Sequence, residues 1–167
     1  GPVTVEYALE HSLNIPAVKA LNMLGKEKLI DALSRIGFKQ VQAKQKSLGL
    51  SLILGGCGTT LEQLTGMYSS FANDGVYYQP SYIVQDSSTQ RKRILSDDAA
   101  YMITDILSRI NRPDFPISWD ATARLPRIAW KTGTSYGRRD AWSISYNKKY
   151  TVGIWVGNFS GVGSVHL

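Results

Sequence analysis

The sequence predicts an α+β protein in which a cluster of helices is followed by a three-stranded antiparallel meander. Through most of the chain up to Ile110, apolar residues recur at helical spacing, whereas from Ile128 onward they alternate with polar residues. Helices that precede the strands, and do not alternate with them, are typical of the α+β class. A chain of 167 residues, 43% hydrophobic and 19% charged, is expected to form a single globular domain.

Capping residues and glycines predict three short helices in the first 37 residues. Thr4 has the position of an N-cap for a helix that runs to about His11. Asn14 is predicted to cap a second helix, which stops at Gly25, and a third helix stops at Gly37. The apolar positions at helical spacing in these last two helices are Val18, Leu21, Leu24, Leu29, Ile30, Leu33 and Ile36.

The glycine-rich stretch 55–58 is interpreted as a turn before a fourth helix. It lacks the Gly-Lys-Ser/Thr sequence that a phosphate-binding loop requires. Thr59 and Glu62 have the spacing of a capping box, and the helix that they open is expected to end at the Asn-Asp-Gly of 73–75. Cys57 is the only cysteine, so an internal disulfide is impossible, and we interpret it as a small apolar turn residue.

The remaining elements are predicted as short strands, one helix and the meander. Short strands are expected at 77–78, 82–84 and 93–95. Ser96 has the position of an N-cap for a helix to about Ile110, and the proline-rich stretch 112–126 is expected to be irregular. The strands of the meander are expected at 128–134, 141–146 and 151–156, with a hairpin turn at 147–149.

The net charge of +6 and the pI near 9.5 raise nucleic acid as a partner. The basic residues, however, occur in short separated groups and form no basic helix face with interleaved aromatic residues. No zinc-ligand spacing is present, and no apolar run approaches the roughly 18 residues of a membrane span. We therefore predict no nucleic-acid partner, no metal and no cofactor, and attribute the charge to solvated turns and anionic cell surfaces.

Lys131-Thr132-Gly133-Thr134 lies where one predicted strand ends, a setting suited to binding an extended peptide. A strand edge presents backbone N–H and C=O groups to such a peptide, and Gly133 leaves room for it. Lys131 would supply a fixed positive field beside a reacting group, and the hydroxyls of Thr132 and Thr134 can hold a terminal carboxylate. The alternative interpretation is a strand with an ordinary solvated lysine.

Ser12-Leu13-Asn14 is a weaker signal, because a capping role fully accounts for Asn14. The two motifs lie 119 positions apart and match, in type and order, two signatures of the serine acyl-transferases that recognise penicillin. We therefore expect Ser12, Asn14 and Lys131 to converge on one cleft.

Four longer segments carry a resemblance to a known family. They are 8–18 (Ala-Leu-Glu-His-Ser-Leu-Asn-Ile-Pro-Ala-Val), 54–64 (Leu-Gly-Gly-Cys-Gly-Thr-Thr-Leu-Glu-Gln-Leu), 71–77 (Phe-Ala-Asn-Asp-Gly-Val-Tyr) and 130–142 (Trp-Lys-Thr-Gly-Thr-Ser-Tyr-Gly-Arg-Arg-Asp-Ala-Trp). These segments resemble the transpeptidase domain of bifunctional class A penicillin-binding proteins, and the resemblance covers almost the whole chain. It implies a β-lactamase/transpeptidase-like fold, in which the meander is part of a five-stranded sheet.

The resemblance also implies a peptidoglycan D,D-transpeptidase, in which a serine attacks a stem peptide and passes the acyl group to an amine. Ser12 would join the proton relay, Asn14 would orient the general-base lysine and the substrate amide, and Lys131 would stabilise charge. Thr134, assisted by Thr132 and next to Gly133, would bind the substrate carboxylate and donate its N–H to the oxyanion hole.

The partners that the resemblance implies are peptidoglycan stem peptides, β-lactams and an upstream glycosyltransferase domain. A membrane anchor outside these residues would place the parent protein in the periplasm, at the outer face of the cytoplasmic membrane. Two alternatives stay open on the same scaffold. One is a β-lactamase or D,D-carboxypeptidase, in which water replaces the amine, and the other is a β-lactam-binding sensor or interaction domain.

The family's Ser-x-x-Lys motif, which bears the nucleophile, is missing before Ser12. The pattern from Ser145 to Lys148 spans a strand end and a turn, whereas the chemistry needs one helical turn, so we interpret it as unrelated. We therefore expect residues 1–167 to be the C-terminal portion of a transpeptidase domain, inactive alone. Without the other strands of the sheet, the strand at 150–158 is expected to be an apolar edge through which the chain self-associates.

Overall fold

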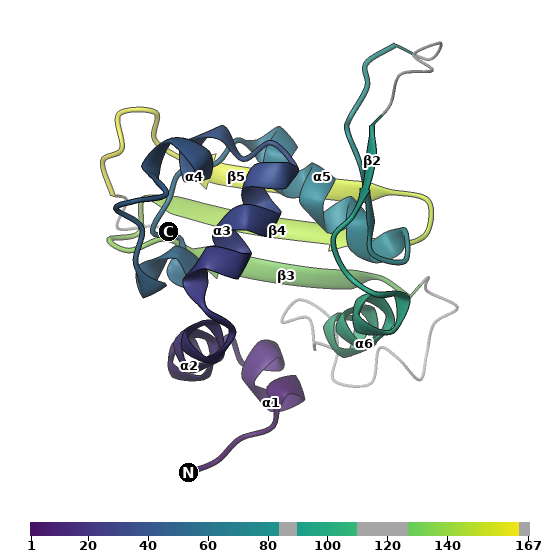
Figure 1. The fold of residues 1–167 in the computed structure, drawn as a ribbon, viewed down its shortest axis with the longest axis horizontal. Helices are drawn as coiled ribbons and strands as arrows, with labels where there is room; N and C mark the ends of the chain where they lie inside the picture. The colour runs from purple at the N-terminus through teal and green to yellow at the C-terminus, as the bar shows by residue number, and fades with distance from the viewer. Residues whose placement is uncertain (84–89, 110–126, 164–167) are drawn as a thin grey trace.

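The computed structural model describes residues 1–83, 90–109 and 127–163, which form an antiparallel sheet with helices packed against one face (Figure 1). The strand order is β3 (Ala129–Thr134), β4 (Asp140–Tyr146) and β5 (Thr151–Gly157). The register places Lys131 opposite Ile144. The predicted α+β class, with a three-stranded antiparallel meander after the helices, is confirmed.

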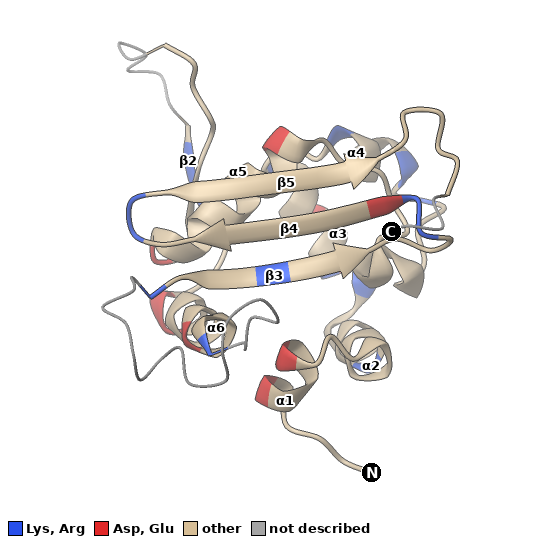
Figure 2. Cartoon of the chain, turned by 180° about the vertical axis from the view of Figure 1, so that it is seen from behind, with Lys and Arg blue, Asp and Glu red and all other residues tan. Residues whose placement is uncertain are grey.

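The helices divide into a group on the sheet and a pair beside it. They are α1 (Val5–Glu10), α2 (Asn14–Leu24), α3 (Lys26–Arg35), α4 (Lys39–Lys44), the 3₁₀ helix η1 (Leu50–Leu54), α5 (Leu61–Ala72) and α6 (Asp97–Ser108). Helix α5 packs against β5 and β4, and α6 packs against β3. Helices α1 and α2 lie beyond the β3 edge, and the other face of the sheet is covered by none of the described helices (Figure 2). A separate hairpin joins β1 (Val76–Tyr78) to β2 (Arg91–Arg93).

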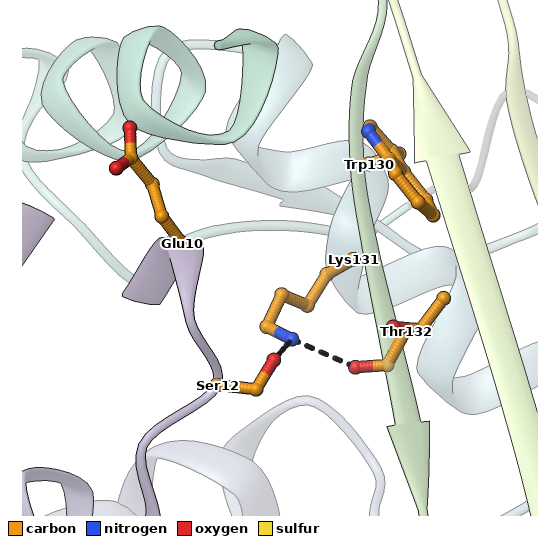
Figure 3. Close-up of a pocket in the computed structure, with 5 residues that line it drawn as sticks. All are labelled: Glu10, Ser12, Trp130, Lys131 and Thr132. Atoms are coloured by element: carbon orange, nitrogen blue, oxygen red, sulfur yellow. Dashed lines mark hydrogen bonds between the residues drawn. The ribbon is translucent and has the colours of Figure 1, made fainter. Parts of the chain in front are cut away.

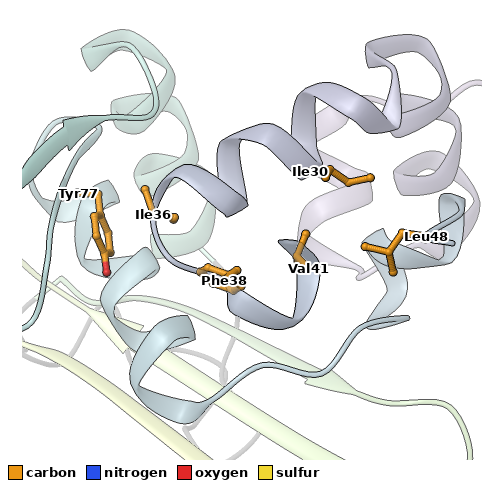
Figure 4. Packing of buried hydrophobic residues seen from close by; sticks show 6 residues of the cluster. All are labelled: Ile30, Ile36, Phe38, Val41, Leu48 and Tyr77. Carbon is orange, nitrogen blue, oxygen red and sulfur yellow. The ribbon is translucent and has the colours of Figure 1, made fainter. Parts of the chain in front are cut away.

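One hydrophobic core lies between α3, α4 and β1 (Figure 4). Its buried members are Ile30, Ile36, Phe38, Val41, Leu48 and Tyr77. Ile30 and Ile36 were expected at helical spacing, and their burial attaches α3 to the rest of the fold. The Lys26 ammonium donates a hydrogen bond to the Leu48 carbonyl at 2.7 Å, which ties the start of α3 to the same region.

A second core joins the sheet to α5 and α6. Leu107, Ala129 and Tyr146 are its buried members, and Tyr68, Phe71, Ala72 and Ile103 pack around them. The Tyr146 hydroxyl lies 3.1 Å from Thr104 Oγ1, so this phenol has a polar partner inside the core. Burial raises the pKa of Tyr68 from 10.0 to about 12, because the apolar surroundings disfavour the charged phenolate.

The predicted caps of the first helix and of α6 are confirmed, but the cap of α5 was misplaced by one residue. Thr60, not Thr59, is the N-cap: its Oγ1 accepts the Gln63 N–H at 3.1 Å. Gln63 Oε1 accepts the Thr60 N–H at 3.2 Å in return, which completes the capping box. The Gln63 amide also donates to the Gly37 carbonyl at 2.7 Å. This contact with the end of α3 involves a residue far away in sequence, so the local pattern around Thr59 and Glu62 could not reveal it.

The predicted cap of α2 was also wrong. Leu13 is the N-cap and makes no side-chain capping bond, and Asn14 is itself the first helical residue. The Leu13 N–H bonds back to the Ala8 carbonyl at 2.9 Å, so the turn after α1 brings the chain directly into α2. The Asn14 side chain is therefore not used for capping.

The intermediate strands were predicted only in part. Tyr77 and Tyr78 lie in β1 as expected, but Tyr82 and Ile83 lie in a bend, and Val84 is outside the described residues. Strand β2 ends at Arg93, where the predicted strand begins, because its pairing with β1 sets its bounds. Helix α4 and the 3₁₀ helix η1 were not predicted. The irregular stretch expected at 112–126 lies outside the described residues.

Replacing Gly153 with Ala is expected to destabilise the protein by about 1–3 kcal/mol. A Cβ at this position would overlap Thr65 Oγ1 and lie 3.1 Å from Leu61 Cδ1, so α5 would have to move away from β5. Urea unfolding measures the effect. Gly133→Ala is the matched control, because nothing lies within 4 Å of its Cβ position, and it is expected to cost much less. Equal losses of stability in the two variants would contradict this account.

Candidate functional site

Ser12 lies in the sharp turn between α1 and α2. Thr4 caps α1, since its Oγ1 accepts the Tyr7 N–H at 3.1 Å, and α1 ends at Glu10. Ser12 has a φ of 52°, in the left-handed region that is uncommon for a residue other than glycine. The exposed hydroxyl of Ser12 is thus presented by a strained turn held between two helices.

Lys131 reaches this turn from the middle of β3. It pairs with Ile144 on β4, so its side chain leaves the sheet on the helix-covered face and extends to Ser12 (Figure 3). Its ammonium donates hydrogen bonds to Ser12 Oγ and, at 2.9 Å, to the Thr132 carbonyl. The structure therefore brings Ser12 and Lys131 together, as the two motifs predicted.

Partial burial of Lys131 lowers the pKa of its ammonium below the ordinary 10.5, because desolvation disfavours the charged form. At a pH between the pKa of Lys131 in the folded chain and its pKa in the unfolded chain, the unfolded chain binds more protons. The contribution of this group to stability therefore rises with pH across that alkaline window. A cation held in a partly dry site acts on its neighbours more strongly than one in water.

Ser12 and Lys131 line a small hollow between α1 and β3. Its other lining residues are Glu10, Trp130 and Thr132. Figure 3 shows Glu10 on the α1 side of the hollow, across from β3. The hollow thus places a hydroxyl and an ammonium next to strand β3, whereas the Glu10 carboxylate is directed away from both. Sequence reasoning did not identify Glu10 or Trp130, although each neighbours a motif.

Asn14, Gly133 and Thr134 lie near the hollow but do not line it. Asn14 is exposed and makes no side-chain hydrogen bond with the part of the chain that the structure describes. Gly133 and Thr134 continue β3 beyond Thr132 and are exposed. The space beside Gly133 is open for 4 Å from its Cβ position, so a ligand can lie against this stretch of β3.

Asp140 fixes the end of β3, and sequence reasoning missed it. Its Oδ2 accepts the Ser135 hydroxyl at 2.8 Å, and its Oδ1 accepts the Trp155 indole N–H at 2.9 Å. The Ser135 N–H also donates to the Asp140 carbonyl at 2.9 Å. One carboxylate thus joins β5 to the turn that directly follows Thr134. The sequence feature that could have indicated this role is an acidic residue five positions after Ser135.

A chain of charged residues holds α1 against α6. Arg109 donates to Glu6 of α1 at 3.1 Å and to Asp105 at 2.5 Å, and Arg127, which precedes β3, also donates to Asp105. The Arg127 hydrogen bond, followed by the nearby Arg109 charge, lowers the pKa of Asp105. Exposed ion pairs contribute little individually, but this network links the two elements that carry Ser12 and Lys131.

Ser145 and Lys148 do not form a second site. Ser145 lies in β4 and Lys148 in the turn before β5, so they are not on one helical turn. Among the described residues no group of three His, Cys, Asp or Glu side chains could hold a metal ion. None of the helices formed by these residues is both long and apolar enough to cross a membrane.

Comparison with known proteins gives consistent matches. The family model described as "Penicillin binding protein transpeptidase domain" matches residues 1–161. Penicillin-binding protein 1C of Escherichia coli is 38% identical over 165 residues, covering 96% of this chain and 20% of that protein. Penicillin-binding protein 1A/1B of Bacillus subtilis is 29% identical over 183 residues, covering 94% of this chain and 20% of that protein. The chain thus spans about a fifth of the length of these relatives.

A solved structure shares the fold. The crystal structure of penicillin-binding protein 1A from Haemophilus influenzae superposes with a TM-score of 0.74 at 20% sequence identity. The match covers 96% of this chain and 31% of that one. At this level of identity the match establishes the fold alone.

Replacing Ser12 with Ala is expected to lower the pKa of the Lys131 ammonium further. Ser12 Oγ accepts a hydrogen bond from the charged form and so stabilises it. NMR titration of the Lys131 side-chain Cε signal measures the change. Ser145→Ala is the matched control and should leave the titration unaltered, because Ser145 is paired with Trp130 on the other face of the sheet. An unchanged Lys131 titration in Ser12→Ala would disprove the contribution of this hydrogen bond.

Proposed function

The chain belongs to the penicillin-binding protein transpeptidase domain family, and on this premise we propose that it forms one wall of a peptidoglycan D,D-transpeptidase active site. The observation that supports this most directly is the contact between Lys131 and Ser12, which joins residues 119 positions apart. In the proposed reaction a serine attacks the penultimate D-Ala carbonyl of a stem peptide and releases the terminal D-Ala as an amine. The acyl group then passes from that serine to an amine of a neighbouring strand.

Ser12 and Lys131 act in this proposal as proton relay and electrostatic support. Because Ser12 Oγ accepts a hydrogen bond from the ammonium, its own hydroxyl proton is free to be donated to the leaving amine. The Lys131 charge stabilises negative charge that develops beside it, and partial burial strengthens this effect. Asn14, which has no capping role, is available to orient the substrate amide and the general-base lysine.

Strand β3 is the proposed docking site for the stem peptide. Its edge towards α1 pairs with no other described strand, so an extended peptide can add to it through backbone hydrogen bonds. Thr132 and Thr134 are exposed along this stretch and would hold the terminal carboxylate, and the open space at Gly133 admits the peptide. The Thr134 N–H would contribute to the oxyanion hole.

The nucleophile is proposed to come from a part of the parent protein outside these 167 residues, which would be the C-terminal portion of the transpeptidase domain. The chain's single Ser-x-x-Lys pattern lies in β4 and the following turn, away from the hollow. The parent would also carry the glycosyltransferase domain and a membrane anchor. It would act in the periplasm, at the outer face of the cytoplasmic membrane, where its stem-peptide substrates lie and β-lactams reach it.

A fluorescent β-lactam is expected to label the longer parent protein but to form no stable adduct with residues 1–167 alone. In the parent, Lys131→Ala should slow labelling by about 10²-fold or more, since it removes charge stabilisation from the site. Lys148→Ala is the matched control and should leave the rate unchanged. Gel fluorescence and mass spectrometry measure labelling. Stoichiometric acylation of Ser145, or of any other serine in the isolated chain, would refute the proposal that the nucleophile lies elsewhere.

The isolated chain is also proposed to self-associate through β5. Its outer edge is unpaired among the described strands, and no residue of Thr151–Gly157 is charged. Val152, Ile154 and Val156 expose 51–53% of their surface on the face of the sheet that no described helix covers. Antiparallel pairing of two copies about Ile154 would place Val152 of each copy beside Val156 of the other.

Sedimentation velocity at micromolar concentration is expected to show dimers or larger species of the isolated chain. Ile154→Lys should shift the chain to monomer, because it puts like charges at the centre of the paired edge. Tyr150→Lys, outside the strand and 70% exposed, is the control and should change association much less. A clean wild-type monomer would rule this association out.

A further inference from the structure

Asp140 and Ser135 form a closed set of hydrogen bonds where the β3–β4 ladder ends. The Ser135 N–H donates to the Asp140 carbonyl at 2.9 Å. In the other direction, the Asp140 N–H donates to Ser135 Oγ at 3.0 Å, and that hydroxyl donates to Asp140 Oδ2 at 2.8 Å. The serine hydroxyl thus accepts from and donates to the same residue, which fixes the backbone directly after Thr134.

The second carboxylate oxygen of Asp140 is anchored to β5. Its Oδ1 accepts the Trp155 indole N–H at 2.9 Å. Asp140 pairs with Gly157, so Trp155, two residues earlier on the same face of β5, reaches the carboxylate directly. The indole ring lies close against the backbone, because a Cβ at Gly157 would be 2.5 Å from Trp155 Cζ2. The position of the ring is therefore set by β5, and it holds the carboxylate in turn.

The N–H of Thr134 is directed to the edge of β3 that faces α1. The N–H and C=O groups of successive residues in an antiparallel strand point to alternate edges. The Ser135 N–H bonds to β4, so the Thr134 N–H points to the opposite edge, which pairs with no other described strand. The Thr132 carbonyl has the same direction and accepts from the Lys131 ammonium there, at 2.9 Å.

We propose that Asp140 is a positioning residue for acyl transfer, because it sets the orientation of the Thr134 N–H. This inference rests on the proposed transpeptidase function, in which that N–H contributes to the oxyanion hole. Gly133 precedes this peptide group and restricts the backbone little, so the constraint comes from the following turn. An oxyanion donor acts only when it is aimed at the developing charge, and a misplacement of about 1 Å can cost about 10²-fold in rate.

Acylation kinetics of the longer parent protein test this proposal. The rate of reaction with a fluorescent penicillin, measured over a series of concentrations, gives the dissociation constant of the non-covalent complex and the acylation rate constant separately. Asp140→Ala should lower the acylation rate constant about tenfold or more and change the dissociation constant less than about threefold, because a transition-state contact is impaired. Asp140→Asn keeps one acceptor oxygen for the two donors, so its rate constant should be intermediate.

Trp155→Phe tests the anchor from a distance, because β5 is not a neighbour of β3 in the sheet. It keeps an aromatic ring, removes the N–H, and should also lower the acylation rate constant. In an Asp140→Ala background it should cause little further loss, since both residues act through one carboxylate. Ile36→Val is the control for lost stability: it lies in the core between α3, α4 and β1, and should lower the melting temperature without altering the acylation rate constant.

The outcomes separate this inference from the proposed function. If the wild-type parent is acylated, and Asp140→Ala changes only the melting temperature or only the dissociation constant, the positioning role is overturned and the proposed function stands. Additive losses in the double variant would also overturn it. If Asp140→Ala does not fold, Asp140→Asn and Trp155→Phe decide the question by the same two constants. A wild-type parent that is not acylated overturns both proposals.

Discussion

The packing of α6 against the first residue of β3 is the contact on which the geometry of the site depends. Leu107, Ala129 and Tyr146 are each at most 3% exposed, so this junction is buried from solvent. It fixes the start of β3, and the register then fixes Lys131 two residues later. At the end of α6, Arg109 holds Glu6 of α1. The position of Ser12 relative to Lys131 therefore follows from one buried junction and one short charged network.

The far end of β3 is fixed separately. Asp140 joins the turn after Thr134 to the Trp155 indole, so the strand is held at both ends while its middle stays open. A strand with fixed ends and an open middle is suited to binding an extended ligand. A rigid backbone keeps its N–H and C=O groups in place, and the exposed residues between the two fixed points carry no packing role that a ligand would disturb. Lys131 is thus partly buried near the end of β3 that packs on α6, whereas Gly133 is exposed before the turn that Asp140 holds.

Several elements were predictable because their signals are local. Thr4 and Ser96 cap their helices as predicted, since a cap needs only the three or four residues that follow it. The meander was predicted because alternation of apolar residues is a property of the strand itself. The cap of α5 failed for the opposite reason: Thr59 and Thr60 both have capping-box spacing, and a contact between Gln63 and the distant Gly37 accompanies the choice of Thr60.

The sequence by itself determined the fold class, the family resemblance and the residue types of the two motifs, because these depend on local order along the chain. Only the tertiary structure decided that Lys131 reaches Ser12 and that Asn14 is left free of capping. It also decided which carboxylate of α1 is paired: Arg109 contacts Glu6 and Asp105, whereas Glu10 has no side-chain partner among the described residues. Such a distinction between two similar carboxylates on one short helix depends on distances through space, and these are set by the packing of elements far apart in the chain.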